Sequence, residues 1–494
     1  MSSGRDICID GRHNIVARQI SSWAKIHDDA HIFCLVCQKV IKDQSDFCKI
    51  EQHAEGKHHM HQVNTKLNLI QLKLYAPGTS SSADLHLESF FIGHATAEIL
   101  SDHILKSINN SGLTLNKLLM LSADGPNVNK KVFRLINEKV KEVRNKELID
   151  IGSCNIHVMH NAFRKGLQKV GNECAEFVIS VFYFFNDWPA RREDYAAIQT
   201  KMGITNHNFL KHVPTRWLTI EPAITRILEQ FESLKYYVLN YLPKHAAKTT
   251  LNSSHYLQMK LFLKKADCKA TLQYVKDFSQ IFSKFTAFFQ REEPLIHLMF
   301  DQLKEILMSM FIKICKQEII IDFSKLDINK IFASENLLDL KNIDLGDTTK
   351  ELIRNLPEKD QLQFLSKVKD SLITSATYIV YQIPLIQSTL RYLSVLNPRN
   401  VKNNNANRYL RKCLEILPYE VDITTVLDEF KLFKLEDLDF SKSSSSFWFE
   451  IDIQDSEGNP KYKTLLGVVK NLLTLSHGNA SVEQGFSLSG HILP

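Results

Sequence analysis

The feature that most constrains the fold of this chain is a helical pattern of apolar residues that continues for more than two hundred residues. From about residue 175 onward, apolar residues recur every three or four positions, as in the segments 219–242 and 358–383. Polar segments at 397–408 and 441–446 interrupt the pattern, and helical spacing returns near the end of the sequence. The pattern predicts a large helical region that has no fixed-length repeat.

A different pattern precedes this region. Apolar segments at 85–91, 117–123 and 147–154 are typical of strands, and they alternate with helical patterns at 93–112, 128–143 and 156–170. Short connections between alternating helices and strands predict parallel strands in one sheet. We therefore expect an α/β domain combined with an all-α region.

Asp124 follows the apolar segment 118–123 and directly precedes Gly125-Pro126-Asn127. A carboxylate at the end of a buried strand is one way in which an α/β protein presents a metal ligand. The alternative is a residue that only begins a loop. The spacing by itself leaves both interpretations open.

Composition limits the class of protein. The 494 residues carry a formal charge of +6, with Lys and Arg spread along the chain, which allows nucleic-acid binding without requiring it. The nine cysteines are an odd number, and no signal segment opens the sequence. The longest apolar run, 177–185, is too short to span a bilayer. We expect a soluble protein of the cytosol or nucleus, without a membrane partner.

Residues 31–62 have the ligand types of a small zinc site. Cys34 and Cys37 are two residues apart, which lets both thiolates reach one tetrahedral ion. His53 follows on an expected short helix, and Gly56 can open that helix so that His58 or His59 becomes the fourth ligand. The alternative is a chance cysteine pair in a histidine-rich surface segment. We expect structural zinc, with the choice between the last two histidines open.

Several segments together resemble a known family. They are "LSADGPNVNKKVFRLINE", "IGSCNIHVMHNAFRKGL", "PARREDY", "PTRWLTIEPAITRILEQF" and "NPKYKTLLGVVKNLLTLSHGNASVEQGFSLSG". They occur in the order found in hAT-superfamily DNA transposases, and the chain most resembles the transposon-derived, domesticated relatives of these enzymes. The resemblance extends over nearly the whole chain and includes a BED-like zinc finger at its start.

The resemblance implies an RNase H-like α/β domain interrupted by a long helical insertion, after a small zinc finger. The expected units are an N-terminal segment (1–30), the zinc finger (31–62), a linker with the first strand (63–84), the first part of the RNase H-like core (85–175), the helical insertion (176–440) and a C-terminal hAT dimerisation region that returns to the core (441–494).

The resemblance also implies site residues. Asp124 matches the second catalytic aspartate, and Glu483 matches the glutamate of the terminal block. Cys154 and His157 match a Cys-x-x-His motif near the active site, and Arg216-Trp217 matches a DNA-contacting Arg-Trp motif. In the family such acids hold Mg²⁺ or Mn²⁺, and the enzymes use these ions to cut DNA at the transposon ends and to join it elsewhere.

Each of these positions has a structural alternative. Cys154, His157 and His160 are three residues apart in turn and can line one helical face, where packing is favoured over a second zinc site. Trp217 is equally well explained as a core aromatic residue. Glu483 by itself would be an ordinary exposed helix residue, and only the surrounding block favours a catalytic role.

The first catalytic acid of the family has no match. The segment 67–75, which would carry it, lies in a stretch from Gly56 to Ala83 that contains no Asp or Glu. Asp84 and Glu88 are the nearest acids, and Asp84 precedes the wrong strand. Two metals without one bridging acid would bind poorly. We expect Asp124 and Glu483 to be vestigial, with no strand cleavage.

Three functions follow from this sequence. The first is a transposase-derived, catalytically inactive protein of the nucleus that binds DNA, associates with itself through its C-terminal region and has a regulatory role or none. The second is an active metal-dependent transposase whose first acid is Asp84 or Glu88. The third is a zinc-finger protein-interaction scaffold, because "IEQHAEGKHH" lacks a dense basic helix.

Overall fold

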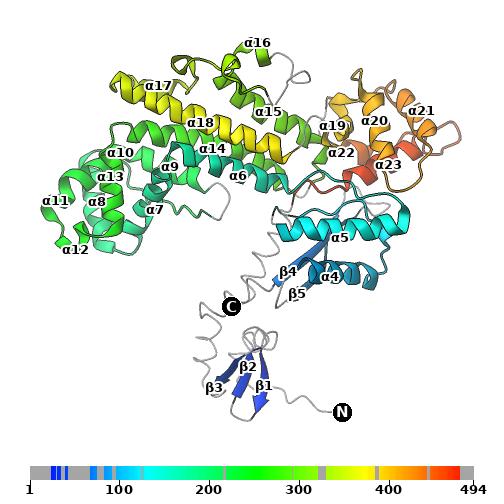
Figure 1. Ribbon diagram of the computed structural model, residues 1–494, viewed down its shortest axis with the longest axis horizontal. Coiled ribbons are helices and arrows are strands. Elements are labelled where there is room, and N and C mark those ends of the chain that lie inside the picture. Colours follow the sequence, from blue (N-terminus) through cyan, green and yellow to red (C-terminus); the bar gives the residue numbers. More distant parts are fainter. Residues whose placement is uncertain are drawn as a thin grey trace.

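The computed structural model describes residues 24–28, 31–34, 39–42, 67–74, 83–91, 96–123, 125, 127–214, 219–291, 293–320, 330–383, 389–441 and 446–478. Side chains are described from residue 96 on, and only the backbone is described in the strands that precede it. Figure 1 shows a long helical body with strands near the N-terminus.

Strands occur in two small antiparallel sheets. In the first sheet, β2 pairs with both β1 and β3, and Cys34 lies opposite Lys39. In the second sheet, β4 pairs with β5, with Lys73 opposite Asp84, Ile70 opposite Glu88, and a bulge between these two pairs. The bounds are β1 Ala24–Asp28, β2 His31–Cys34, β3 Lys39–Lys42, β4 Leu67–Leu74 and β5 Ala83–Phe91.

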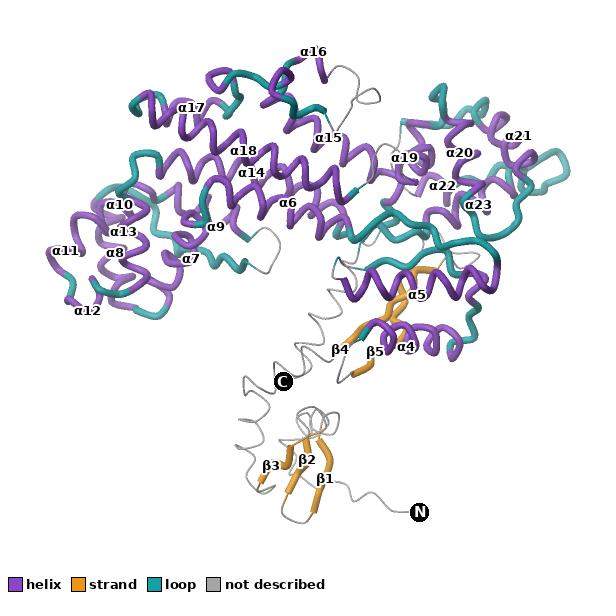
Figure 2. Tube along the Cα trace, viewed as in Figure 1, coloured by secondary structure: helices purple, strands orange, loops and turns teal. Residues whose placement is uncertain are grey.

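The expected RNase H-like α/β domain is wrong, because the chain is mostly helical. Beyond Phe91 the described residues form no strand, only two isolated bridges (Figure 2). The segments 118–123 and 148–154 are extended, and two backbone hydrogen bonds join them, from Ile149 N to Leu119 O (2.9 Å) and from Cys154 N to Ala123 O (3.1 Å). Two bonds are too few for a ladder.

The reason lies in what covers these two segments. Leu118, Leu121 and Leu148 pack into a small core between two helices, α4 and α5, whereas Leu119 and Ile149 pack into the main helical core. Burial by helices therefore explains the apolar runs that predicted strands. Periodicity alone does not distinguish a buried strand from another buried segment.

The helical predictions fare better. The helices expected at 93–112, 128–143, 156–170 and 358–383 are present as α4, α5, α6 and α18, and the segment 219–242 is divided among α9, α10, η2 (a π-helical turn) and α11. The bounds of these elements are α4 Ala97–Asn110, α5 Asn127–Arg144, α6 Asn155–Val170, α18 Glu358–Gln382, α9 Ile220–Glu229, α10 Phe231–Tyr236, η2 Tyr237–Tyr241 and α11 Leu242–His245.

The middle of the body is formed by α6, α14, α15 and α18 (Figure 1). Helix α6 packs along α18 and against α14, and α15 packs against α18 and α14. Helices α7 to α13 lie at one end of the body, and α16 and α17 lie above it. The bounds are α7 Glu173–Asn186, α8 Pro189–Lys201, α12 Lys248–Leu251, α13 Ser254–Leu263, α14 Cys268–Phe289, α15 Ile296–Ile314, α16 Gln317–Ile320, α17 Asp347–Ile353, and the short turns η1 Leu115–Lys117, η4 Ser334–Asn336 and η5 Leu340–Asn342.

The other end of the body consists of the C-terminal helices. Trp448 is fully buried, and its Nε1 donates to Leu396 O at 2.6 Å, which joins the last helices to the middle of the chain. The described helices include none that is long and apolar enough to cross a membrane. The bounds are α19 Thr389–Leu393, η6 Ser394–Leu396, η7 Pro398–Asn400, α20 Ala406–Glu415, α21 Ile423–Phe433, α22 Ser446–Glu450 and α23 Lys463–Leu473.

Candidate functional site

Three segments that are distant in the sequence meet at the N-terminus of α6. Cys154 is the N-cap residue of this helix, is 1% exposed, and donates its backbone N–H to Ala123 O. On the other side lies Gly478, where a Cβ would be 2.9 Å from Ile156 Cδ1 and 4.0 Å from Cys154 Sγ. A side chain at this position would require the Ile156 side chain to shift. The chain just before position 124 and the chain five residues before position 483 therefore both touch the first turn of α6.

Two histidines lie on the next part of this helix, and a third, His212, is close to them. His157 and His160 are half-buried on α6, and His212 is buried on the segment that follows α8. Burial, reinforced by the charges of Arg164 and His157, lowers the pKa of His160 to about 4. Burial, reinforced by His160, lowers the pKa of His212 to about 4. At neutral pH both rings are uncharged.

His212 and His160 form hydrogen bonds with the chain on either side of residues 215–218. The Thr219 hydroxyl accepts from Val213 N (2.9 Å), donates to Val213 O (3.2 Å) and bonds His212 Nδ1 (2.9 Å). The backbone of Pro214 is hydrogen-bonded to His160. Val213, Pro214 and Thr219 are therefore held together beside α6.

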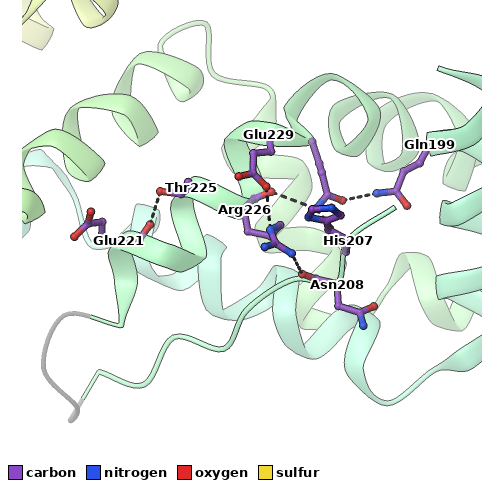
Figure 3. Close-up of polar contacts among 8 residues, drawn as sticks. Gln199, His207, Asn208, Glu221, Thr225, Arg226 and Glu229 are labelled. Carbon is purple, nitrogen blue, oxygen red and sulfur yellow. Dashed lines mark hydrogen bonds and ion pairs between the residues drawn. The ribbon is translucent and has the colours of Figure 1, made fainter. Parts of the chain in front are cut away.

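The segment that leads to this point is tied to α9 (Figure 3). Gln230 Nε2 donates to His207 O at 3.1 Å, and Arg226 Nη1 donates to Asn208 O at 3.3 Å. Arg226 is itself held by Glu229, at 2.9 Å, and Gln230 accepts from Gln199 on α8. Phe209, which follows Asn208, is buried. The residues around α9 and α8 thus hold the segment 207–213, which has no regular secondary structure.

Acidic residues are absent from the sequence of these elements. The segment 151–172, which contains α6, has Arg164, Lys165 and Lys169 but no Asp or Glu, and the segment 195–220 likewise has no acid. Lys165 lies over the Tyr378 ring at 5.2 Å, and Lys211 lies over Tyr183 at 5.4 Å. The neighbourhood of His160 is therefore basic, which would attract an anionic partner.

The structure describes only some of the sequence-predicted site residues. Cys154 and His157 lie on the first turns of α6, and Cys34 is the last residue of β2. Within the described ranges, no three His, Cys, Asp or Glu side chains are close enough to hold a metal ion. The predictions for Cys37, His53, His58, His59, Asp124, Arg216, Trp217 and Glu483 fall outside the described residues.

Sequence reasoning missed the residues that position this site. Thr219, Arg226 and Gln230 are close to Arg216-Trp217 in the sequence, but nothing in their spacing indicates that they bind the backbone of 207–213. The one available signal was the block "PTRWLTIEPAITRILEQF", which contains all three.

A cavity of about 890 Å³ lies elsewhere, between α17 and the start of α18. Its floor includes the buried side chains of Ile343, Leu345 and Ile353, and charges of both signs surround it. It is at the opposite end of α18 from Gln382, whose carbonyl faces Gly152 just before α6. The cavity and the N-terminus of α6 are therefore separate features.

Comparison of the sequence with models of known protein families and with curated proteins finds no match.

Proposed function

We propose that this chain is a transposase-derived protein of the nucleus that binds DNA and associates with itself, and that no longer cuts DNA. The observation that carries the proposal is the meeting of segments at α6. Ala123, Cys154 and Gly478 lie together at the first turn of this helix, and Pro214 is bonded to the second histidine of the helix, His160.

The four segments belong to four of the blocks that resemble hAT transposases. Their members are up to 355 residues apart in the sequence, from Ala123 to Gly478, and nothing in the local sequence would bring them to one helix. An ancestral site in which Asp124, Glu483 and Arg216-Trp217 act on one DNA strand would require this proximity. The resemblance and the described contacts thus support the same assignment by independent routes.

Charge supports a nucleic-acid partner. The acid-free segments 151–172 and 195–220 adjoin at His160 and Pro214, and their Lys and Arg side chains would neutralise phosphates. Loss of cleavage is supported by the sequence of β4, since Leu67–Leu74 contains no carboxylate and the site would lack its first acid. Phosphodiester cleavage by a metal pair depends on ligands that bridge the ions.

The zinc finger is part of the proposal. The strands β2 and β3 form an antiparallel hairpin in which Cys34 pairs with Lys39, so Cys37 lies in the four-residue connection. Two cysteines at a hairpin turn fit the thiolate half of a tetrahedral site, and His53 with His58 or His59 would complete it. Stoichiometric zinc in the purified chain is the expected result.

Self-association is supported by the C-terminal helices. Leu432 at the end of α21 is 54% exposed, and Leu435, two residues beyond this helix, is 82% exposed, so two apolar side chains close in sequence are available to a partner copy. We expect a dimer in solution by light scattering, and Leu435→Glu is expected to shift it toward monomer. A monomeric wild-type chain would remove this part of the proposal.

A nicking assay tests the whole assignment. The full chain is incubated with supercoiled plasmid and Mg²⁺ or Mn²⁺, and its binding to duplex DNA is measured in the same buffer. We expect binding without nicking, and equal binding by Asp124→Asn. Metal-dependent nicking that Asp124→Asn abolishes would show an active transposase instead, and absence of any DNA binding would favour a protein-interaction scaffold.

A further inference from the structure

The longest acid-free stretch of the sequence lies away from α6. From residue 371 to residue 414 there is no Asp or Glu, whereas Arg391, Arg399, Lys402, Arg408, Arg411 and Lys412 give six positive charges, as many as the net charge of +6 of the whole chain. The net basicity is therefore not spread evenly. This stretch contains the second half of α18, then α19 and α20.

The fold brings part of this charge to one surface. On α20, Ala406, Leu410, Cys413 and Leu414 are buried, and Arg408 and Arg411 are exposed on the other face. Side chains three positions apart on a helix have Cβ atoms roughly 5–6 Å apart. Asn404 and Asn405 are exposed at the N-terminus of the same helix. The result is a stripe of guanidinium and amide groups along α20.

The partners of the surrounding cations show which charges are available. Lys412 is paired with Glu415 at 2.7 Å, and Arg391 Nε donates to the Tyr409 hydroxyl at 3.0 Å. Arg399 Nε donates to Ser441 O at 2.6 Å, and Lys402 lies over the Phe440 ring at 4.6 Å.

Arg408 and Arg411 differ from these cations, because neither has an ion pair or a hydrogen bond to another described residue. On an ordinary protein surface that serves solubility, positive and negative side chains are interspersed, so an exposed arginine has acidic residues nearby. Here the helix itself offers no acid before Glu415, and that carboxylate already serves Lys412.

We propose that Arg408 and Arg411, with Asn404 at the start of the same helix, form a second contact surface for the phosphate backbone of duplex DNA. The inference rests on the proposed function and adds a site to it. Arginine forks match phosphate oxygens, and side-chain amides donate to them, without any reading of sequence.

The surface fits DNA better than a membrane. Among the described residues from 389 to 415, none with a large apolar side chain is strongly exposed, so this stretch itself offers no apolar side chain to enter a bilayer. Lys146, just before the segment 148–154, donates to Leu417 O at 2.8 Å, which ties the chain that precedes α6 to the end of α20.

The test uses the full chain and a random-sequence duplex, with affinity measured by fluorescence anisotropy over a series of salt concentrations. Each phosphate contact contributes about 0.9 to the slope of log affinity against log salt concentration. Arg408→Gln/Arg411→Gln is expected to lower that slope by about 2 and to weaken binding roughly tenfold. Arg408→Lys/Arg411→Lys keeps the charges and is expected to keep most of the slope.

The matched control is Lys244→Gln/Lys248→Gln, which removes two exposed charges at the far end of the body, near α11 and α12 (Figure 1). It is expected to leave the slope unchanged. An unchanged slope in Arg408→Gln/Arg411→Gln, or an equal drop in the control, would overturn the inference while leaving DNA binding intact. Failure of the wild-type chain to bind the duplex would overturn the proposed function as well. Stronger binding to anionic vesicles than to DNA, lost in the arginine variant, would assign the surface to membranes instead.

Discussion

At the scale of single residues, the neutral histidines beside α6 make stability depend on pH. The pKa of His160 and of His212 is about 4 in the folded chain, against about 6.5 for an unperturbed histidine. Between these values the unfolded chain binds more protons than the folded one, so the free energy of unfolding falls as the pH falls from 6.5 toward 4. Above pH 6.5 this contribution is fully present.

One pKa unit corresponds to about 1.4 kcal/mol, so two groups whose pKa values are each lowered by about 2.5 are expected to remove up to about 7 kcal/mol over that range. Urea unfolding at a series of pH values measures this loss of unfolding free energy. His212→Asn keeps a polar group near the Thr219 hydroxyl and is expected to reduce the pH dependence. His207→Asn, an exposed neighbour on the same segment, is the control. An identical pH dependence in His212→Asn and the wild type would contradict the prediction.

Arg144 is a second residue with a defined structural role. Its guanidinium donates to five backbone carbonyls, of which Leu118 O is the closest at 2.6 Å. Lysine cannot reproduce this planar fork. Arg144→Lys is therefore expected to lower the free energy of unfolding by about 1–3 kcal/mol. Arg134→Lys on the same helix, whose ion pair with Glu138 is exposed and 3.9 Å long, is expected to change it by less than about 0.5 kcal/mol. Equal effects would mean that the carbonyl bonds are unimportant.

At the scale of elements, α6 and α18 approach closely because residue 166 has no side chain. A Cβ on Gly166 would lie 2.1 Å from Ser375 Oγ and 3.0 Å from the Ser371 carbonyl oxygen. The Ser375 hydroxyl meanwhile donates to Ala162 O at 2.8 Å, so it is not free to move away. Gly166→Ala is expected to cost about 1–3 kcal/mol despite the better helix propensity of alanine.

Gly467 provides the matched substitution. It also lies inside a helix, α23, but a Cβ there would meet nothing within 4 Å. Gly467→Ala is expected to raise the free energy of unfolding by up to about 1 kcal/mol. Thermal or urea unfolding of the two variants decides the matter: a stabilising Gly166→Ala would show that the helices can separate without loss.

The elements also show what the sequence could and could not predict. The spacing of Val132, Ile136 and Val140 predicted α5 because these side chains fill one buried stripe, and they are buried in the structure. The parallel sheet was wrong because Leu118 and Leu119 are partly buried against two different helical cores, which produces the same apolar run as a buried strand. The approach of Gly478 to Cys154 depends on tertiary packing between segments more than three hundred residues apart, and no local pattern contains it.

At the scale of the whole molecule, the described helices divide into two hydrophobic cores of very different size. The large core extends from Ile149 to Leu475 and includes helices from both ends of the body, so most of the chain is expected to unfold together. The small core consists of Ala97, Leu100, Val132, Ile136, Val140 and Leu148, between α4 and α5. Only the extended segments 118–123 and 148–154 contribute side chains to both.

This division predicts that α4 and α5 open independently of the rest. Ile136 is 0% exposed, and Ile136→Ala is expected to remove about 2–5 kcal/mol from the small core. Hydrogen exchange should then increase in α4 and α5 while protection in α14 and α18 stays at the wild-type level. Leu372→Ala, a truncation at 1% exposure in α18, should instead raise exchange throughout the large core. Loss of protection across α14 and α18 in Ile136→Ala would mean that the two cores are one cooperative unit.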